Sequence, residues 1–358
     1  MKINQFEPKI SKKDKLAINS YLNSGGWLTE NKLTKDLENK IATYVNRKYA
    51  IAVPNGTQAI YLSLLAAGIE KGSVVAVPNL TMIATINAVI WAGATPYIVD
   101  TDEYLCMDFE KLKKIKKLDA VIYVPLNGRT KNGIDIDRWC KKNNIKLIED
   151  SAHALGSTYE NKIMCGGLGD LSIFSFTPHK IMTMGQGGMV LTDNKKMFEK
   201  LFKLKTFNRM KNKSDWHDGF GLNFKITDLQ AAIGLSQFDQ LNSFISTKKN
   251  NYQKLKKMIK NENTTVCKFE NYETPWFYDL KLNSKLIRNK FFSYMSKNEI
   301  ETRPHYPCLS KQKYLKGVMS TNLEYSETES DKLIWLPSST NLKVKEIKLI
   351  AETINNFS

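Results

Sequence analysis

The chain has 358 residues, of which 42% are hydrophobic and 10% aromatic, and this composition excludes a mostly disordered protein. Domains usually hold roughly 100–200 residues, so the length predicts one large and one small domain. Lys and Arg number 53 against 36 Asp and Glu, a net charge of +17. Because these basic residues are spread along the whole chain without an arginine cluster, we expect no nucleic-acid partner.

Neither a membrane span nor a metal site is expected from the sequence. No run approaches ~18 consecutive apolar residues, the length that a spanning helix requires. The first residues are mixed and charged, unlike a signal peptide, so we expect a cytoplasmic protein. The five cysteines form no Cys-x-x-Cys pair and the four histidines have no metal-ligand spacing, which predicts reduced thiols and no metal.

Short β-branched runs alternate with helical patterns between about residues 50 and 192. This alternation predicts an α/β fold with a mostly parallel sheet that helices cover on both faces. The seven predicted strands are Ala50–Val53, Val74–Val77, Pro96–Val99, Ala120–Val124, Lys146–Glu149, Leu171–Ser175 and Met189–Thr192. Ligands of such sheets bind at the carboxyl ends of the strands, so the polar residues that follow each strand are the candidates for chemistry.

The pattern becomes helical after about residue 228 and mixed after about residue 262. Long helices are predicted at Leu229–Phe244 and Thr247–Ile259, followed by a strand at Phe277–Leu282 and a terminal helix at Val344–Ile354. We therefore predict two domains. Residues 1–245 would form an N-terminal arm and the large domain, and residues 246–358 a smaller C-terminal α/β domain.

Two of the segments that follow predicted strands contain candidate binding residues, the first for an anion and the second for a cationic group. In Asn55-Gly56-Thr57, Gly56 lets the backbone approach a ligand and Thr57 adds a hydroxyl at a helix N-terminus, where phosphate is favoured; an ordinary capped turn is the alternative. In Glu149-Asp150-Ser151-Ala152-His153, alternation sends the two carboxylates to different environments. A carboxylate there can pair with a protonated ring nitrogen, or it can simply cap the next turn.

A third segment contains one lysine in an apolar and aromatic setting. Lys180 follows the strand Leu171–Ser175 and precedes the turn Gly185-Gln186-Gly187-Gly188. A partly desolvated lysine loses some preference for its charged form, so it can act as a nucleophile or form a Schiff base. In a fourth segment, Asn223 lies in an aromatic-rich turn before a helix and on its own indicates turn chemistry.

Together these segments resemble the DegT/StrS sugar aminotransferases, which are pyridoxal 5'-phosphate (PLP) enzymes of fold type I. The series that carries the resemblance is Asn55-Gly56-Thr57, Glu149-Asp150-Ser151-Ala152, Ser175-Phe176 with Lys180, Gly185-Gln186-Gly187-Gly188 and Gly221-Leu222-Asn223-Phe224. It extends from Gly26-Trp27-Leu28-Thr29 to Leu336-Pro337-Ser338. The resemblance implies PLP as cofactor and a large, mostly parallel seven-stranded sheet. It also implies amino transfer from L-glutamate to a nucleotide-linked sugar, in amino-sugar biosynthesis for polysaccharides such as O-antigen.

The resemblance also implies a role for individual residues. Lys180 would carry PLP and move a proton, and Asp150 would pair with the pyridinium nitrogen. His153 takes the place of a family Gln or Glu near the phenolic oxygen of the cofactor. The residues that would bind the phosphate are Gly56, Thr57 and Ser175. Asn223 would reach the phosphate in the neighbouring subunit, which implies a homodimer with shared active sites.

The chain departs from the family pattern at three positions. Met82 stands where the family has an aromatic residue stacked on the PLP ring, and a methionine can still cover a ring face because it is polarizable. Gln186 replaces a usual Glu, and Leu309 replaces a usual His, which puts part of the sugar pocket in doubt. Certain PLP dehydratases of the family carry His in place of the lysine, but the spacing from Lys180 to Gly185 favours Lys180 over His179.

The substrate is indicated by fewer residues. Trp216-His217-Asp218 resembles the perosamine-synthase branch, which aminates C4 of a GDP-linked 4-keto-6-deoxy sugar. Arg129 is a candidate for contact with a diphosphate, and His217 and His305 are candidates for the sugar pocket; His217 as a surface turn residue is the alternative. Amination at C3, sugar dehydration, a small phosphorylated ketone as substrate and a non-catalytic PLP-binding protein remain the alternatives.

Overall fold

The computed structural model describes residues 2–213 and 215–358. Its larger sheet has eight strands in the order β1-β7-β6-β5-β4-β2-β3-β11. Their bounds are β1 Tyr49–Val53, β2 Val74–Pro78, β3 Thr95–Val99, β4 Ala120–Tyr123, β5 Lys146–Asp150, β6 Leu171–Ser175, β7 Gly188–Thr192 and β11 Met319–Ser320. Only β7 runs antiparallel to its neighbours. The mostly parallel sheet is therefore confirmed, and β11 adds an eighth strand to the seven that the sequence predicts.

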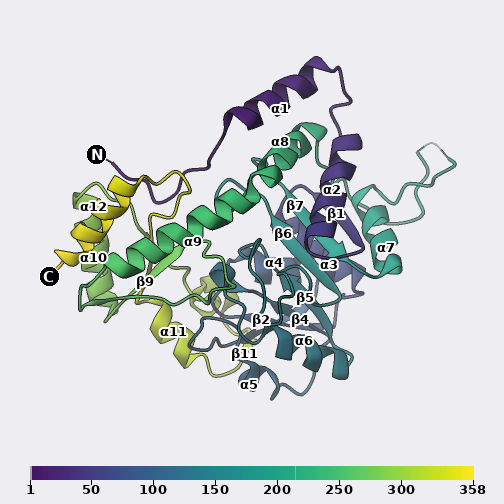
Figure 1. Ribbon diagram of the computed structural model, residues 1–358. Coiled ribbons are helices and arrows are strands. Elements are labelled where there is room, and N and C mark those ends of the chain that lie inside the picture. The colour runs from purple at the N-terminus through teal and green to yellow at the C-terminus, as the bar shows by residue number, and fades with distance from the viewer. Residues whose placement is uncertain (1, 214) are drawn as a thin grey trace.

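Helices cover both faces of this sheet (Figure 1). Residues that alternate along β1 show the two faces, because Ile51 and Val53 pack into one hydrophobic core and Ala50 and Ala52 into another. The first core also holds residues of α3 Gly56–Ala66, α4 Ala84–Trp91 and α7 Lys195–Lys205. The opposite face packs against α2 Lys32–Tyr44, α6 Gly133–Lys142 and α8 Asp228–Asp239. Burial of the strands on both faces is expected, because the helices that connect parallel strands cover both faces of the sheet.

A second, antiparallel sheet has the order β10-β12-β9-β8. Its strands are β8 Thr264–Val266, β9 Tyr278–Leu282, β10 Arg303–Pro304 and β12 Leu333–Leu336. It shares one core with α9 Leu241–Met258, α10 Lys285–Lys297 and α12 Val344–Asn355, in which Tyr252, Leu280, Phe291 and Ile350 are buried. Figure 1 shows α9 running from α8 beside the larger sheet to α12 beside the smaller one.

The chain crosses between these two parts more than once. The predicted boundary at residues 245 and 246 falls inside α9, and Ile3 packs in the core of the second sheet. The short strand β11 comes from the C-terminal region but pairs with β3. The helix α1 Lys12–Asn23 packs on α8, where Asp14 accepts hydrogen bonds from Ser236 and Gln237. The division into residues 1–245 and 246–358 therefore stays a prediction.

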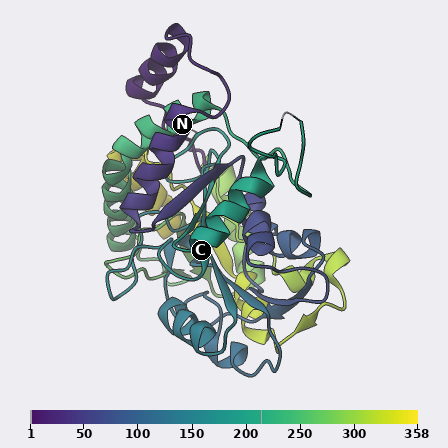
Figure 2. The same ribbon diagram turned by 90° about the vertical axis from the view of Figure 1, so that its right-hand side faces the viewer.

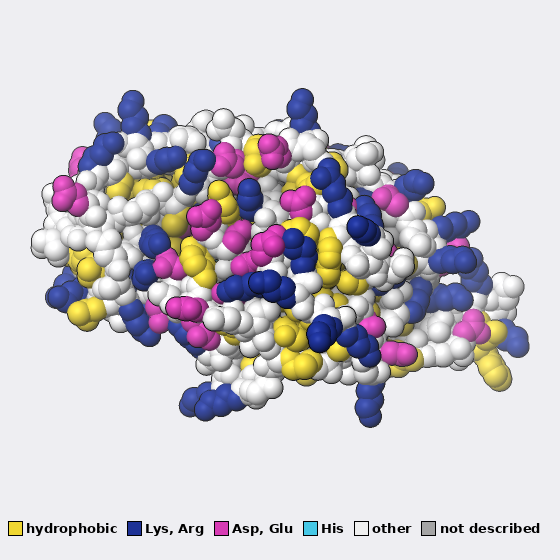
Figure 3. Space-filling model, turned by 90° about the horizontal axis from the view of Figure 1, so that it is seen from below, with side chains coloured by type: hydrophobic (Ala, Val, Ile, Leu, Met, Phe, Trp, Pro, Cys, Tyr) yellow, Lys and Arg dark blue, Asp and Glu magenta, His cyan; other side chains and the backbone are white. Residues whose placement is uncertain are grey.

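The surface and the helices give two further observations. In the face that Figure 3 shows, Lys and Arg lie interspersed with Asp and Glu, which agrees with their spread along the sequence. Among the described residues, no helix is both long and apolar enough to cross a membrane.

Candidate active site

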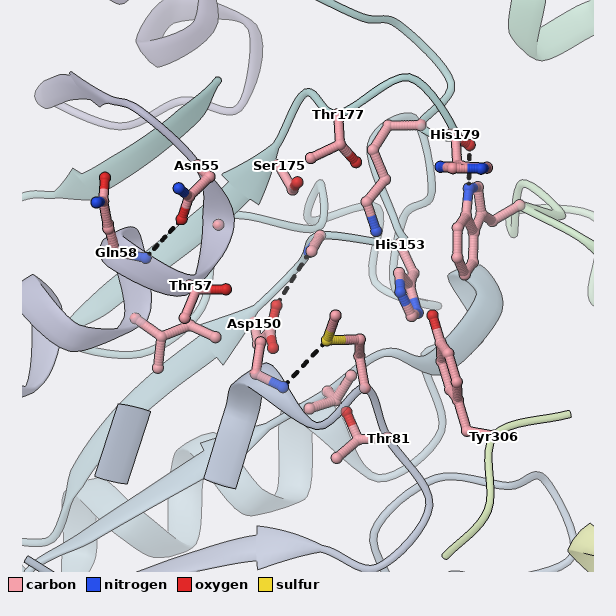
Figure 4. Close-up of a pocket in the computed structure, with 18 of the residues that line it drawn as sticks. Asn55, Thr57, Gln58, Thr81, Asp150, His153, Ser175, Thr177, His179 and Tyr306 are labelled. Atoms are coloured by element: carbon pink, nitrogen blue, oxygen red, sulfur yellow. Dashed lines mark hydrogen bonds between the residues drawn. The ribbon is translucent and has the colours of Figure 1, made fainter. Parts of the chain in front are cut away.

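A cavity of about 590 Å³ opens at the carboxyl ends of the strands of the larger sheet. The strands β1, β5 and β6 point the same way, so their last residues, Val53, Asp150 and Ser175, lie at one edge of the sheet. Figure 4 shows Asp150 and Ser175 at this edge. Seven of the predicted site residues line this cavity: Gly56, Thr57, Met82, Asp150, His153, Ser175 and Lys180. Residues more than 100 positions apart in the sequence are thus brought together as the strand-end argument predicts.

The first turn of α3 forms an anion cradle in this cavity. Asn55 caps the helix, its Oδ1 accepting a hydrogen bond from Gln58 N at 2.9 Å. Gly56 lies against β6 so closely that a Cβ atom there would be 3.0 Å from the Cβ of Ser175. The free N–H groups of the helix therefore lie beside the hydroxyls of Thr57 and Ser175, an arrangement that suits a phosphate group.

Asp150 ends β5 at the buried wall of the cavity, with only 5% of its surface exposed. Its Oδ2 accepts a hydrogen bond from Thr85 Oγ1 at 2.9 Å, and its Oδ1 accepts a longer one from Ala152 N at 3.3 Å. Burial raises the pKa of Asp150, while the bond from Thr85 and the charge of Lys180 oppose this rise. A buried carboxylate with spare acceptor capacity fits a protonated ring nitrogen.

Glu149 lies in a different environment from Asp150, as the alternation along β5 predicts. Its carboxylate is fully buried and accepts hydrogen bonds from Ser151 Oγ at 2.6 Å, Tyr159 OH at 2.8 Å, Gly166 N at 2.9 Å and Leu168 N at 2.8 Å. These bonds hold the segment 151–168 against the sheet. Glu149 therefore fixes the loop that carries His153 without lining the cavity itself.

Lys180 projects its amine into the cavity from the turn that follows β6. The turn is held by a bond from Lys180 N to Thr177 O at 3.0 Å. Burial lowers the pKa of Lys180 to about 7, and the negative charge of Asp150 partly opposes this effect. Among the described residues, no hydrogen-bond acceptor or carboxylate is paired with its Nζ, which lies 4.3 Å from the centre of the Trp276 ring. An unpaired, partly neutral amine can react with the aldehyde of PLP.

An aromatic wall closes the cavity on the side of the second sheet. Trp276 stacks on His153 with ring centres 3.9 Å apart, and its Nε1 donates to His179 O at 2.7 Å. Tyr306 lies beyond His153 at 6.1 Å between ring centres. The sequence alone does not identify Trp276 or Tyr306 as site residues. The only local signal was an aromatic residue at the edge of a predicted strand for Trp276 and an aromatic residue beside a proline for Tyr306.

His153 and Met82 complete the cavity wall. Burial lowers the pKa of His153 well below its usual value, so the ring is neutral at pH 7, and its buried Nδ1 has no hydrogen-bond partner among the described residues. Met82 is 41% exposed, and its sulfur accepts a bond from Ala84 N at 3.0 Å. The orphaned ring nitrogen, the anion cradle, the buried carboxylate and the free amine together fit PLP, which carries a matching polar group for each of them.

Two predicted substrate contacts are not brought to this cavity. Arg129 is 3% exposed, and its Nη1 lies 2.5 Å from Asp279 Oδ2 in a buried ion pair. His305 is 4% exposed behind Tyr306, with Nε2 3.7 Å from Asp279 Oδ1. Burial lowers the pKa of His305 to about 4. Arg129, which follows β4, is therefore paired with β9 of the second sheet, whereas His305 is enclosed within the second sheet itself. Neither residue lines the cavity.

Two other predicted residues lie between α7 and α8, in a segment of which part projects from the molecule (Figures 1 and 2). His217 is exposed, and its Nδ1 is 2.8 Å from Phe207 O, so within this chain it has the geometry of a surface turn residue. Asn223 is also exposed, with its backbone paired to Thr206. Neither residue lines the cavity of its own chain.

Comparison with known proteins agrees with this geometry. Residues 8–355 match the DegT/DnrJ/EryC1/StrS aminotransferase family. The chain belongs to this family. It is 34% identical to a GDP-perosamine synthase of Escherichia coli O157:H7, over 98% of this chain and 97% of that protein, and 29% identical to a GDP-perosamine synthase of Vibrio cholerae, over 98% of each.

Among solved structures, Helicobacter pylori PseC, described as an aminotransferase involved in the biosynthesis of pseudoaminic acid, superposes with a TM-score of 0.90 over 99% of this chain and 98% of that one, at 24% identity. This similarity confirms the predicted fold. The family membership and the relatives identify the protein as a PLP-dependent sugar aminotransferase.

Proposed function

We propose that this aminotransferase moves the amino group of L-glutamate to C4 of a GDP-linked 4-keto-6-deoxy sugar. The observation that carries the proposal is the cavity in which Lys180, Asp150 and the α3 cradle meet, in a chain 34% identical over 98% of its length to a GDP-perosamine synthase. The segment Trp216-His217-Asp218 supports the same branch of the family.

Each side chain of the cavity has a task in this proposal. PLP, when bound, supplies an electron sink that stabilises negative charge on the substrate carbon. Asp150 holds a proton at the ring nitrogen, which keeps that sink effective. With PLP bound, the Lys180 amine would carry a proton between the substrate carbon and the cofactor carbon, and its pKa of about 7 suits both taking up and giving back that proton at neutral pH. Trp276 and His153 exclude water from one side of the amine.

The amino donor would be held through its carboxylate by Arg303. This residue starts β10, lines the cavity beside His179 and has no carboxylate partner among the described residues. Its positive charge contributes to lowering the pKa of His179, after the larger effect of burial. A guanidinium on a strand, with its donors free, is suited to bidentate recognition of a carboxylate such as that of L-glutamate.

The enzyme would work as a homodimer with shared active sites. Asn223 is exposed, lies outside the cavity of its own chain and pairs through its backbone with Thr206 at the end of α7, a position from which it can reach a second copy. We propose that Asn223 completes the phosphate site of the partner subunit, and that His217 on the same loop faces the sugar nucleotide there.

The acceptor is tested with a panel of GDP-, UDP- and dTDP-linked 4-keto-6-deoxy sugars, each incubated with the PLP-loaded enzyme and L-glutamate. Mass spectrometry should detect an amino sugar with the GDP-linked substrate first, and NMR of the product should place nitrogen on C4. Nitrogen on C3 would contradict the C4 assignment. Amination of a small phosphorylated ketone while every sugar nucleotide fails would show that the sugar-nucleotide assignment is wrong for this chain.

A further inference from the structure

A chain of two buried hydroxyls ends on the carboxylate of Asp150. Thr85 Oγ1 donates to Asp150 Oδ2 at 2.9 Å, and Thr81 Oγ1 lies 3.2 Å from Thr85 Oγ1. The exposed fractions are 0% for Thr85 and 1% for Thr81. Thr81 lines the cavity together with Asp150 (Figure 4), whereas Thr85, in the first turn of α4, does not line it.

The direction of the hydrogen bonds in this chain follows from the donor and acceptor capacities of its members. An ionised carboxylate only accepts, and a threonine hydroxyl has one proton to donate. When Asp150 is ionised, the Thr85 hydroxyl must therefore donate its hydrogen bond to Oδ2. In the contact between the two threonines, Thr81 must then be the donor. If Asp150 were protonated on Oδ2, the order could reverse. The order Thr81 to Thr85 to Asp150 is thus the one that the ionised carboxylate requires.

We propose that Thr85 is a positioning residue of this aminotransferase, which keeps Asp150 ionised and fixes the orientation of its carboxylate through the hydroxyl bond to Oδ2. Oδ1 receives only the 3.3 Å bond from Ala152 N, so it retains the acceptor capacity for a cationic N–H in the cavity. Burial raises the pKa of Asp150, and the bond from Thr85 is the largest effect that opposes this rise, ahead of the charge of Lys180.

The side chain of Thr85 is suited to this task by its rigidity. A threonine side chain is stiff at χ1, because its Cβ carries two heavy atoms. The backbone is held by Thr85 N donating to Met82 O at 3.1 Å. A hydrogen bond whose donor is fixed in this way loses little entropy when it forms, so it can hold the carboxylate in one plane.

The test uses PLP labelled with ¹⁵N in its ring, bound to the enzyme without donor or acceptor, so its result does not depend on which sugar or amino acid is used. Thr85→Val removes the hydroxyl and keeps the shape, and Thr85→Ser keeps the hydroxyl. Thr34→Val is a matched control, because Thr34 is also buried and its hydroxyl also donates to a carboxylate, with 2.6 Å between Thr34 Oγ1 and Asp228 Oδ1. Neither residue lines the cavity.

In Thr85→Val the ¹⁵N shift should move toward that of an unprotonated ring, and the dissociation constant of PLP should rise about tenfold, the effect of losing one hydrogen bond to a charged group. Thr85→Ser and Thr34→Val should keep the shift and the affinity of the unmodified enzyme. If Thr85→Val does not fold, Thr85→Ala removes the same hydroxyl without adding volume. An unchanged shift in the variants that lack the hydroxyl, or an equal change in Thr85→Ser or Thr34→Val, would overturn the proposal.

Discussion

Arg129 Nη1 lies 2.5 Å from Asp279 Oδ2, and both side chains are almost completely removed from solvent. The Asp279 carboxylate also accepts from Asn127 Nδ2 at 2.5 Å and from Trp335 Nε1 at 2.7 Å. Asn127 and Arg129 follow β4 of the larger sheet, while Asp279 and Trp335 belong to β9 and β12 of the smaller one. This cluster therefore fastens the two sheets to each other beside the cavity.

Arg129→Met should reduce the free energy of unfolding by about 3–5 kcal/mol, because it leaves the Asp279 carboxylate buried without its cation. Urea unfolding followed by circular dichroism measures this loss. Arg138→Met is the control: that arginine is exposed and only 3.8 Å from Asp135, so its removal should cost less than about 1 kcal/mol. If Arg129→Met were instead fully stable but had a raised KM for the sugar nucleotide, the result would support the diphosphate contact that the sequence suggests for Arg129.

The parts of the site that could be predicted are those encoded by one strand and the turn after it. Asp150 and Lys180 each follow a run of β-branched or aromatic residues, and parallel strands bring their carboxyl ends to one edge whatever the rest of the fold does. The strand β11 could not be predicted, because two residues, Met319 and Ser320, carry no periodic signal and pair only once β3 is in place.

The parts that could not be predicted depend on contacts between distant segments. Trp276 reaches His153 and Lys180 only because the second sheet docks on the first, and nothing in its local sequence encodes that docking. Arg129 has the side chain of a phosphate ligand, but its partner Asp279 lies 150 positions later in the chain. Burial and pairing of this kind decide what an arginine does, and they are set by the tertiary structure.

Lys180 and Lys248 allow a matched test of the PLP attachment site. Burial lowers the pKa of each to about 7. Lys248 Nζ donates to the carbonyl oxygens of Trp276 and Ser338, whereas the Lys180 amine is free in the cavity. Borohydride reduction and peptide mass mapping should therefore find the pyridoxyl group on Lys180, and the label should be absent from Lys180→Met and present in Lys248→Met. A label on any other lysine would show that the assignment is wrong.

The rate at which the apoenzyme captures PLP should depend on pH with a midpoint near 7. Only the neutral amine attacks an aldehyde, and the pKa of Lys180 is lowered to about 7, so the rate should rise about tenfold between pH 6 and pH 8 and then level off. Because the charge of Asp150 raises the pKa of Lys180, Asp150→Asn should move the midpoint to lower pH. Stopped-flow absorbance measures both profiles, and a midpoint near 10 would indicate an ordinary, solvated lysine.

The shared active site leads to a complementation test between two inactive variants. Lys180→Ala lacks the amine, and Asn223→Ala lacks the amide that we propose acts in the partner subunit. In a heterodimer of the two, the cavity that keeps Lys180 belongs to the Asn223→Ala chain, and the other chain supplies its Asn223. One of the two cavities is then complete, so mixing the variants under subunit exchange should restore activity.

The recovered activity should approach one quarter of that of the unmodified enzyme, because random exchange makes half of the dimers mixed and each of these has one complete site of two. Lys180→Ala mixed with Lys180→Met is the control and should recover nothing. If Asn223 instead served its own chain, the mixed dimer would pair a cavity without Lys180 with a cavity without Asn223, and the mixture would stay as inactive as its components. Sedimentation of the same samples checks that the dimer is the active species.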